Sequence, residues 1–172
     1  ELIKAIGWVY SPGCSTPYLA CWARRSSFKV EDLNKLVFDE RQLVQLETLR
    51  GCSMLVPKNQ AEIALRIRTR TFTELSKQAR QQMPISESDM EKLKVAVLKA
   101  LQHGPRTPEQ IRTAVPAPLV EDFEPELKRI GLTNSLTLGI NLLKEEGKLI
   151  KQQAKKRLDV TEYSLALTGN VL

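Results

Sequence analysis

The sequence is poor in the residues from which metal and redox sites are built. Its 172 residues include three cysteines (Cys14, Cys21 and Cys52), which form no CxxC pair, and a single histidine, His103. A structural zinc site needs four ligands, and a catalytic cysteine needs a neighbouring base. The sequence also contains neither a GxGxxG nor a P-loop motif. We therefore expect no metal, no cofactor, and buried thiols in a reducing compartment.

Long apolar runs are also missing. No hydrophobic stretch reaches the roughly 20 residues that span a bilayer, and the segment after Glu1 lacks the charged and apolar parts of a signal peptide. These absences predict a cytoplasmic, nucleoid-associated protein without a membrane partner. Because residue 1 is Glu and not Met, we also expect the chain to be a piece of a longer protein.

What the sequence does have is positive charge concentrated in one short segment. The formal net charge is +6 and the pI is about 9.3. Residues 148–157 carry five cations and no acid, which is typical of a surface that contacts phosphates. We expect double-stranded DNA as the partner, the alternative being a solvated surface without a ligand. The five cations are Lys148, Lys151, Lys155, Lys156 and Arg157.

Residues 105–167 follow the order helix, helix, helix, hairpin. Thr107, Pro108 and Gln110 have the types and spacing of a capping box at the start of the first helix. The third helix begins near residue 133 and ends at Gly147, and two short strands then enclose the basic run. This is the winged-helix plan, in which the third helix lies in or near the major groove. Its candidate DNA contacts are Thr133, Asn134, Ser135, Thr137 and Asn141, unless these side chains only cap the helix and the unit binds protein.

The first half repeats this plan less clearly. Leu19, Trp22 and Ala23 form an apolar stripe on the first expected helix, so we predict that Trp22 lies in the core. Val44, Leu46 and Thr48 alternate with polar residues, as in a half-buried strand. The expected elements are helices at 16–25 and 30–38 and strands at 44–48 and 52–56.

Pro84 marks the expected boundary between two domains, at 1–84 and 85–172. Serines after Pro84 are suited to cap a helix over 87–102, whose apolar stripe runs from Met90 to Leu101. A further helix is expected at about 72–83. The predicted fold is mainly α with small β-hairpins (α+β), arranged as tandem winged helix-turn-helix units.

Two blocks in the first half carry a specific resemblance. Residues 17–24 read PYLACWAR and residues 49–57 read LRGCSMLVP. They resemble the "YLALWAR" helix and the "RGTLHLVP" strand of the winged-helix DNA-binding family that includes the bacterial AlkZ/YcaQ-type DNA glycosylases. The resemblance extends over nearly the whole chain. It implies tandem winged helices with a concave DNA-binding surface, and an enzyme that removes alkylated or crosslinked purines. Arg50, in the second block, is one further candidate DNA contact.

The chain departs from this family at the position of catalysis. The family carries a Gln-x-Gln or Gln-x-Asp triplet shortly before the "YLALWAR" helix, whose side chains position water and stabilise the sugar cation. The matching residues here are Tyr10-Ser11-Pro12, and no Gln lies between Glu1 and Gln42. The family's Thr and His in the strand are replaced by Cys52 and Met54. We therefore expect no catalysis through this triplet.

Three functions remain open from the sequence. The first is a DNA-binding tandem winged-helix protein that is related to repair glycosylases but lacks their catalytic Gln motif. The second is an active glycosylase that excises alkylated or crosslinked purines, in which Trp8, Tyr10 or Trp22 stacks on a flipped base. The third is a transcription regulator that binds DNA as a symmetric dimer, in which the apolar stripe at 90–101 forms the contact between the two copies.

Overall fold

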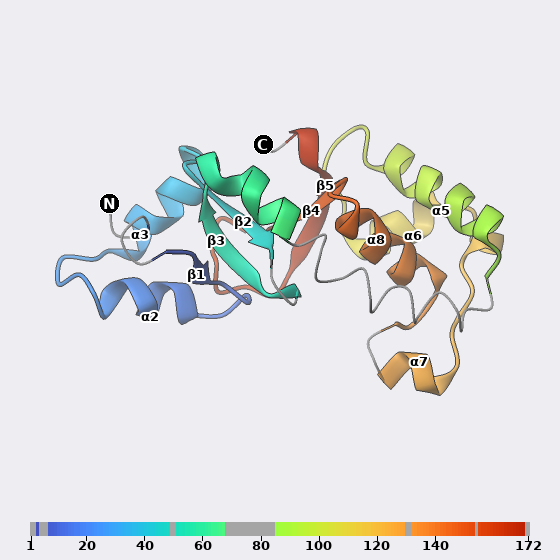
Figure 1. Cartoon of the computed structure of the whole chain (residues 1–172), viewed down its shortest axis with the longest axis horizontal. Coiled ribbons are helices and arrows are strands. Elements are labelled where there is room, and N and C mark those ends of the chain that lie inside the picture. Colours follow the sequence, from blue (N-terminus) through green and yellow to red (C-terminus); the bar gives the residue numbers. More distant parts are fainter. Residues whose placement is uncertain are drawn as a thin grey trace. The chain divides into compact units, whose positions relative to one another are not determined.

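A computed structural model describes residues 3, 7–48, 51–67, 85–129, 132–153 and 155–170 (Figure 1). The helix expected at 72–83 and the boundary expected at Pro84 lie outside these residues. Helices combined with small antiparallel sheets make the fold α+β, as predicted. The chain forms two compact units, the first from the described residues of 1–71 and 151–163 and the second from those of 72–150 and 164–171.

The first unit is built on a three-stranded antiparallel sheet with the strand order β1-β3-β2. β2 (Leu43–Glu47) and β3 (Ser53–Pro57) form the predicted hairpin, and β1 (Val9–Tyr10) pairs with the other edge of β3. The predicted alternation is confirmed, because Val44 and Leu46 of β2 are both buried. The remaining elements of this unit are α2 (Thr16–Trp22), α3 (Val30–Asn34), a π-helix η1 (Lys35–Asp39), a 3-10 helix η3 (Lys58–Gln60) and a helix at 61–67.

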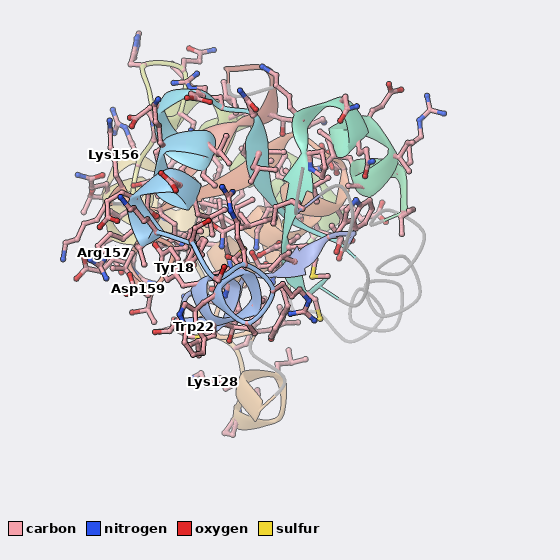
Figure 2. The ribbon with its side chains drawn as sticks, turned by 90° about the vertical axis from the view of Figure 1, so that its left-hand side faces the viewer. Tyr18, Trp22, Lys128, Lys156, Arg157 and Asp159 are labelled. Atoms are coloured by element: carbon pink, nitrogen blue, oxygen red, sulfur yellow. The ribbon has the colours of Figure 1, made fainter. Side chains whose placement is uncertain are left out.

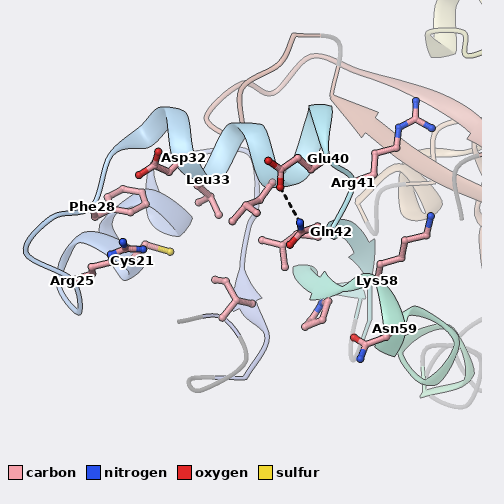
Figure 3. Close-up of a pocket in the computed structure, with 14 residues that line it drawn as sticks. Cys21, Arg25, Phe28, Asp32, Leu33, Glu40, Arg41, Gln42, Lys58 and Asn59 are labelled. Atoms are coloured by element: carbon pink, nitrogen blue, oxygen red, sulfur yellow. Dashed lines mark hydrogen bonds between the residues drawn. The ribbon is translucent and has the colours of Figure 1, made fainter. Parts of the chain in front are cut away.

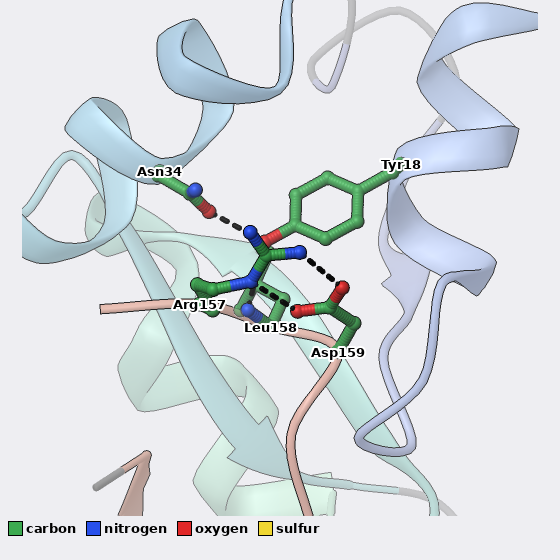
Figure 4. Close-up of polar contacts among 5 residues, drawn as sticks. All are labelled: Tyr18, Asn34, Arg157, Leu158 and Asp159. Atoms are coloured by element: carbon green, nitrogen blue, oxygen red, sulfur yellow. Dashed lines mark hydrogen bonds and ion pairs between the residues drawn. The ribbon is translucent and has the colours of Figure 1, made fainter. Parts of the chain in front are cut away.

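Leu158, far along the chain, completes the core of the first unit. Its side chain is 0% exposed and belongs to the same hydrophobic cluster as Leu33 and Leu55. Its backbone N–H donates to the hydroxyl of Tyr18 at 2.8 Å, and that hydroxyl donates to Oδ1 of Asn34 at 2.6 Å (Figure 4). Burial is the main cause that raises the pKa of Tyr18, so the hydroxyl stays protonated and keeps both bonds.

Gly13 lets the chain before α2 approach the same late segment. Its φ is +90°, a left-handed conformation that glycine adopts without strain. A Cβ at this position would lie 2.9 Å from the carbonyl oxygen of Val160. Residues 158–160 therefore contact the rest of the first unit through the side chain of Leu158 and through the backbone of Leu158 and Val160.

The predicted burial of Trp22 is wrong. Trp22 is 65% exposed and Leu19 is 60% exposed, and the buried face of α2 carries Pro17, Tyr18 and Cys21. A helix of seven residues presents two stripes at the same spacing, so its apolar pattern does not decide which one faces inward. Tyr18 determines which stripe faces inward, because its hydroxyl forms hydrogen bonds with Asn34 and with the backbone N–H of Leu158.

The second unit packs α5 (Glu87–Ala100) against α8 (Ser135–Glu145), where Gly139 of α8 lies against Met90 and Leu93 of α5. The predicted α5 stripe is confirmed, since Met90, Leu93, Val97 and Leu101 are buried and Leu98, the fifth member, is half-buried. The predicted capping box between Thr107 and Gln110 is also confirmed. The elements are α5 (Glu87–Ala100), α6 (Pro108–Ala114), η4 (Ala117–Leu119), α7 (Pro125–Arg129), α8 (Ser135–Glu145) and η5 (Thr168–Asn170). β4 (Leu149–Gln153) and β5 (Tyr163–Leu167) form a two-stranded sheet, of which residues 149–150 and 164–167 belong to this unit.

A buried lysine ties the two long helices of this unit together. Nζ of Lys94 lies 2.8 Å from Glu91 on its own helix and 2.5 Å from Glu146, the residue that follows α8. Glu146 also pairs with Lys148 at 2.7 Å. Burial alone would raise the pKa of Glu146, but the hydrogen bonds from Lys148 and Lys94 outweigh it and lower the pKa.

Replacing Tyr18 with Phe should destabilise the chain by about 1–3 kcal/mol, because the buried N–H of Leu158 loses its acceptor. Replacing Trp22 with Ala, four residues along the same helix, should change stability by no more than about 0.5 kcal/mol, as at an exposed position. Urea unfolding of both variants measures the two effects. Equal losses would contradict the assigned orientation of α2.

Replacing Glu146 with Gln should remove a pH-dependent part of the stability. A lowered carboxyl pKa stabilises the fold above the unfolded value of about 4.3, and this contribution disappears as the pH falls through the lower folded value. We expect a loss of roughly 1–3 kcal/mol at pH 7 that shrinks by pH 3, measured by urea unfolding. Glu121→Gln, at an exposed carboxylate of the same unit, is the control. An equal loss at both pH values would show that Glu146 acts by packing alone.

Candidate nucleic-acid interface

Each cation of the basic run has a carboxylate partner in the folded chain. The run contains no acid in the sequence, but folding and the residues just before and after it bring five acids to it. Figure 2 shows Lys156, Arg157 and Asp159 together at the surface. The nitrogen–oxygen pairs are Lys148 with Glu146 (2.7 Å), Lys151 with Glu47 (2.8 Å), Lys155 with Glu162 (3.1 Å), Lys156 with Asp39 (2.5 Å) and Arg157 with Asp159 (2.5 Å).

These ion pairs differ in how firmly they hold their cations. The pairs of Lys155 and Lys156 are exposed on both sides, and such pairs contribute little free energy. Lys151 is held more tightly, because its partner Glu47 is largely buried and its Nζ also lies 4.8 Å from the centre of the Tyr163 ring. A phosphate can therefore replace the carboxylate more easily at Lys155 and Lys156 than at Lys151.

Arg157 stabilises the turn that places Leu158 in the core of the first unit. Its Nε donates to Oδ1 of Asp159 at 2.8 Å and its Nη2 to Oδ2 at 2.5 Å, a two-pronged contact (Figure 4). Hydrogen bonding from Arg157 is the main cause that lowers the pKa of Asp159. The guanidinium of Arg157 is thus engaged in the local structure, and its contact with Asp159 must break before it can bind a ligand.

The N-terminal residues of α8 are mostly engaged within the fold. Asn134 caps the helix by accepting from the N–H of Thr137 at 2.9 Å, and the hydroxyls of Thr133 and Thr137 lie 2.9 Å apart. Ser135 is fully buried, and its hydroxyl donates to the carbonyl of residue 119 and accepts from the N–H of residue 121. Thr133 is exposed and Asn141 is half-buried, whereas Arg50 lies outside the described residues.

The positions that match the family's catalytic triplet and strand lie side by side. Tyr10 of β1 pairs in register with Met54 of β3. Ser11 is fully buried, and Nε2 of Gln45 donates to both its hydroxyl (3.0 Å) and its carbonyl oxygen (2.7 Å). The amide of Gln153 in turn lies 3.1 Å from Oε1 of Gln45. The polar groups at this position are therefore bonded to one another.

Three cations that follow α2 have a different environment. Arg24, Arg25 and Lys29 are exposed, and within the described residues none of them has a carboxylate partner. Arg24 donates to the carbonyl of Ala20 at 2.9 Å, and Arg25 donates to the hydroxyl of Ser27 at 3.3 Å. They do not form a dense run, so cation density does not reveal them. The signal in the sequence is the absence of any acid over residues 2–30.

A pocket of about 460 Å³ opens in the first unit at the end of α2 and the open end of the β2–β3 hairpin (Figure 3). This size is typical of small-ligand sites. Arg41 at its edge has a φ of +51°, which is uncommon for a residue other than glycine. Because the rim carries both cations and carboxylates, its charge favours neither an anionic nor a cationic ligand. The charged lining residues are Arg25, Asp32, Glu40, Arg41 and Lys58.

The cysteines do not converge on one site. Cys21 is buried and desolvation raises the pKa of its thiol, whereas a hydrogen bond from Thr16 lowers the pKa of the exposed Cys14. Cys14 and Cys52 are both exposed, so the predicted burial of the thiols is wrong for two of the three cysteines and holds only for Cys21. Within the described residues, no group of three His, Cys, Asp or Glu side chains is placed to hold a metal ion.

Among the helices of the described parts of the chain, none combines the length and the apolar character that crossing a bilayer requires.

Comparison with known proteins gives one clear relationship. The family model described as DNA glycosylase AlkZ-like matches residues 3–166 and confirms the resemblance carried by residues 17–24 and 49–57. No curated protein and no solved structure matches the chain. The chain therefore belongs to the AlkZ-like DNA glycosylase family, which relates it to DNA repair and to DNA as a substrate or partner.

Proposed function

We propose that this chain binds double-stranded DNA through tandem winged helices and does not release bases from it. The observation that carries the proposal is the state of Ser11. This residue occupies the centre of the expected catalytic triplet, yet it is fully buried and its hydroxyl already accepts a hydrogen bond from Gln45. The family relationship supports DNA as the partner.

The order of the elements supports the winged-helix part of the proposal. Along the chain, α6, α7 and α8 are followed by the β4–β5 sheet, and α2 and α3 are followed by the β2–β3 hairpin. Both arrangements follow the order of a helix-turn-helix with a wing. In such a unit α8 would approach the major groove, and the loop between β4 and β5 would contact the backbone.

The proposed contacts on DNA follow from which groups are accessible. Thr133 and Asn141 can reach a groove or a phosphate, and Lys155 and Lys156 can exchange their exposed carboxylates for phosphates. Asn134, Ser135 and Thr137 would contribute mainly by fixing the start of α8. The other proposed phosphate contacts are Lys148, Lys151, Arg157 and, from the sequence alone, Arg50.

The absence of base release is proposed from the chemistry of the reaction. Breaking an N-glycosidic bond develops positive charge on the sugar and needs a water held by an amide or a carboxylate. Tyr10 offers only a hydroxyl, and Met54 beside it has no proton acceptor of useful strength. The amides of Gln45 and Gln153 are half-buried and contact each other, so neither is free to hold a water for attack.

DNA binding should weaken steeply with salt if three or four cations contact phosphates. The logarithm of the binding constant should then fall against the logarithm of the salt concentration with a slope of about −3 to −4. Lys155→Ala combined with Lys156→Ala should reduce this slope and weaken binding to every duplex. Fluorescence anisotropy at several salt concentrations measures both. A flat response would remove the electrostatic argument.

The internal ion pairs predict a gain of affinity in one variant. Asp39→Asn frees Lys156 from its carboxylate and should tighten DNA binding by about 2- to 5-fold, as expected for breaking an exposed pair. Glu87→Gln removes the same charge from the exposed start of α5 and is the matched control. If both variants bind alike, the gain reflects only net charge and Lys156 is not a contact.

The experiment on catalysis uses duplex DNA that contains N7- or N3-methylpurines. We expect free base to appear no faster than by spontaneous depurination, because the expected catalytic position offers no amide or carboxylate. Rapid release by the purified chain would overturn the proposal and favour an active glycosylase. Loss of that release in Gln45→Ala would then identify the amide that holds the water.

A further inference from the structure

The outer face of α2 carries an apolar surface that the fold does not use. Leu19 and Trp22 lie three residues apart, on one side of the helix, and are 60% and 65% exposed. Figure 2 shows Tyr18 beside Arg157 and Asp159, in agreement with its bond to the backbone of Leu158, whereas Trp22 lies on the outer side of α2. Contiguous exposed apolar surface marks interaction sites on proteins, whereas a single exposed apolar residue is ordinary.

Charge at the end of α2 indicates what this surface binds. Arg24, Arg25 and Lys29 follow Trp22, are exposed, and have no carboxylate partner within the described residues. The cations of the basic run are all paired, so the end of α2 is the more available positive surface of the first unit. An aromatic side chain next to cations that are not neutralised by carboxylates of the described residues matches a nucleic-acid strand, whose bases stack and whose phosphates are negative.

We propose that the Leu19–Trp22 face of α2 stacks on an unpaired base of DNA while Arg24, Arg25 and Lys29 contact the phosphates that flank it. In a regular duplex the faces of the bases are covered by their neighbours, so only an unpaired or displaced nucleotide offers a face to Trp22. The inference rests on the proposed DNA binding and adds the kind of DNA that this surface selects.

The other tryptophan makes the test specific. Trp8 is half-buried, and its indole N–H donates to Oε1 of Gln60 at 2.8 Å. The sequence contains only these two tryptophans. In a Trp8→Phe variant, whose fold is checked by circular dichroism, the indole fluorescence therefore comes from Trp22 alone.

The experiment compares two duplexes of equal length, one fully paired and one with a single bulged adenine. Stacking should make the bulged duplex bind about 5- to 100-fold more tightly, and it should quench the fluorescence of Trp22. Trp22→Ala, in the wild-type background, should lose this preference and keep its binding to the paired duplex. Ile63→Ala is the matched control, because Ile63 is a similarly exposed apolar residue of the first unit at 57%.

The outcomes separate this inference from the proposed function. If the wild-type chain binds neither duplex, the proposed DNA binding fails and the stacking surface fails with it. If the chain binds DNA but Trp22→Ala keeps the preference, or Trp22 is not quenched, only the stacking surface is overturned. If Trp22→Ala changes self-association and leaves the DNA preference intact, the face is a contact between copies of the chain.

Discussion

The insertion of Leu158 into the core of the first unit is the contact on which the rest of this unit depends. The residue lies about a hundred positions beyond the strands that it covers, and its N–H reaches the hydroxyl of Tyr18 on α2. That single hydroxyl also bonds Asn34 on α3, so two helices and a distant turn share one buried polar group. A buried donor without a partner is costly, which makes this arrangement specific as well as stabilising.

The same insertion explains the charge pattern of the basic run. Once Leu158 is buried, the residues around it are held against the first unit, where Asp39 and Glu47 meet Lys156 and Lys151. Part of the positive charge of the basic run is thus neutralised by carboxylates within the fold. DNA contact at these lysines is an exchange of carboxylate for phosphate, with a smaller net gain of free energy than for unpaired cations.

The parts of the fold that the sequence predicts are those set by local chemistry. The capping box at Thr107 follows from the spacing of its residue types. The stripe of α5 follows from its apolar spacing, because a helix of 14 residues repeats its apolar face several times. The orientation of the seven-residue α2 does not, since Trp22 and Tyr18 are equally suited to burial until a partner for the hydroxyl is known. The two acids that pair with the run from the first unit, Asp39 and Glu47, lie about a hundred residues away and are likewise hidden from local patterns.

Hydrogen exchange at the amide of Leu158, in the free chain and with duplex DNA bound, measures directly whether this residue is held in the core of the first unit. The amide is buried and bonded to Tyr18, so we expect it to exchange only on opening of the whole first unit, as slowly as the amides of β3. Bound DNA should change the surroundings of Lys155 and Lys156 but should leave the Leu158 amide protected from exchange. Fast exchange in either state would contradict the account, because the basic run would then be a free arm and not a part of the first unit.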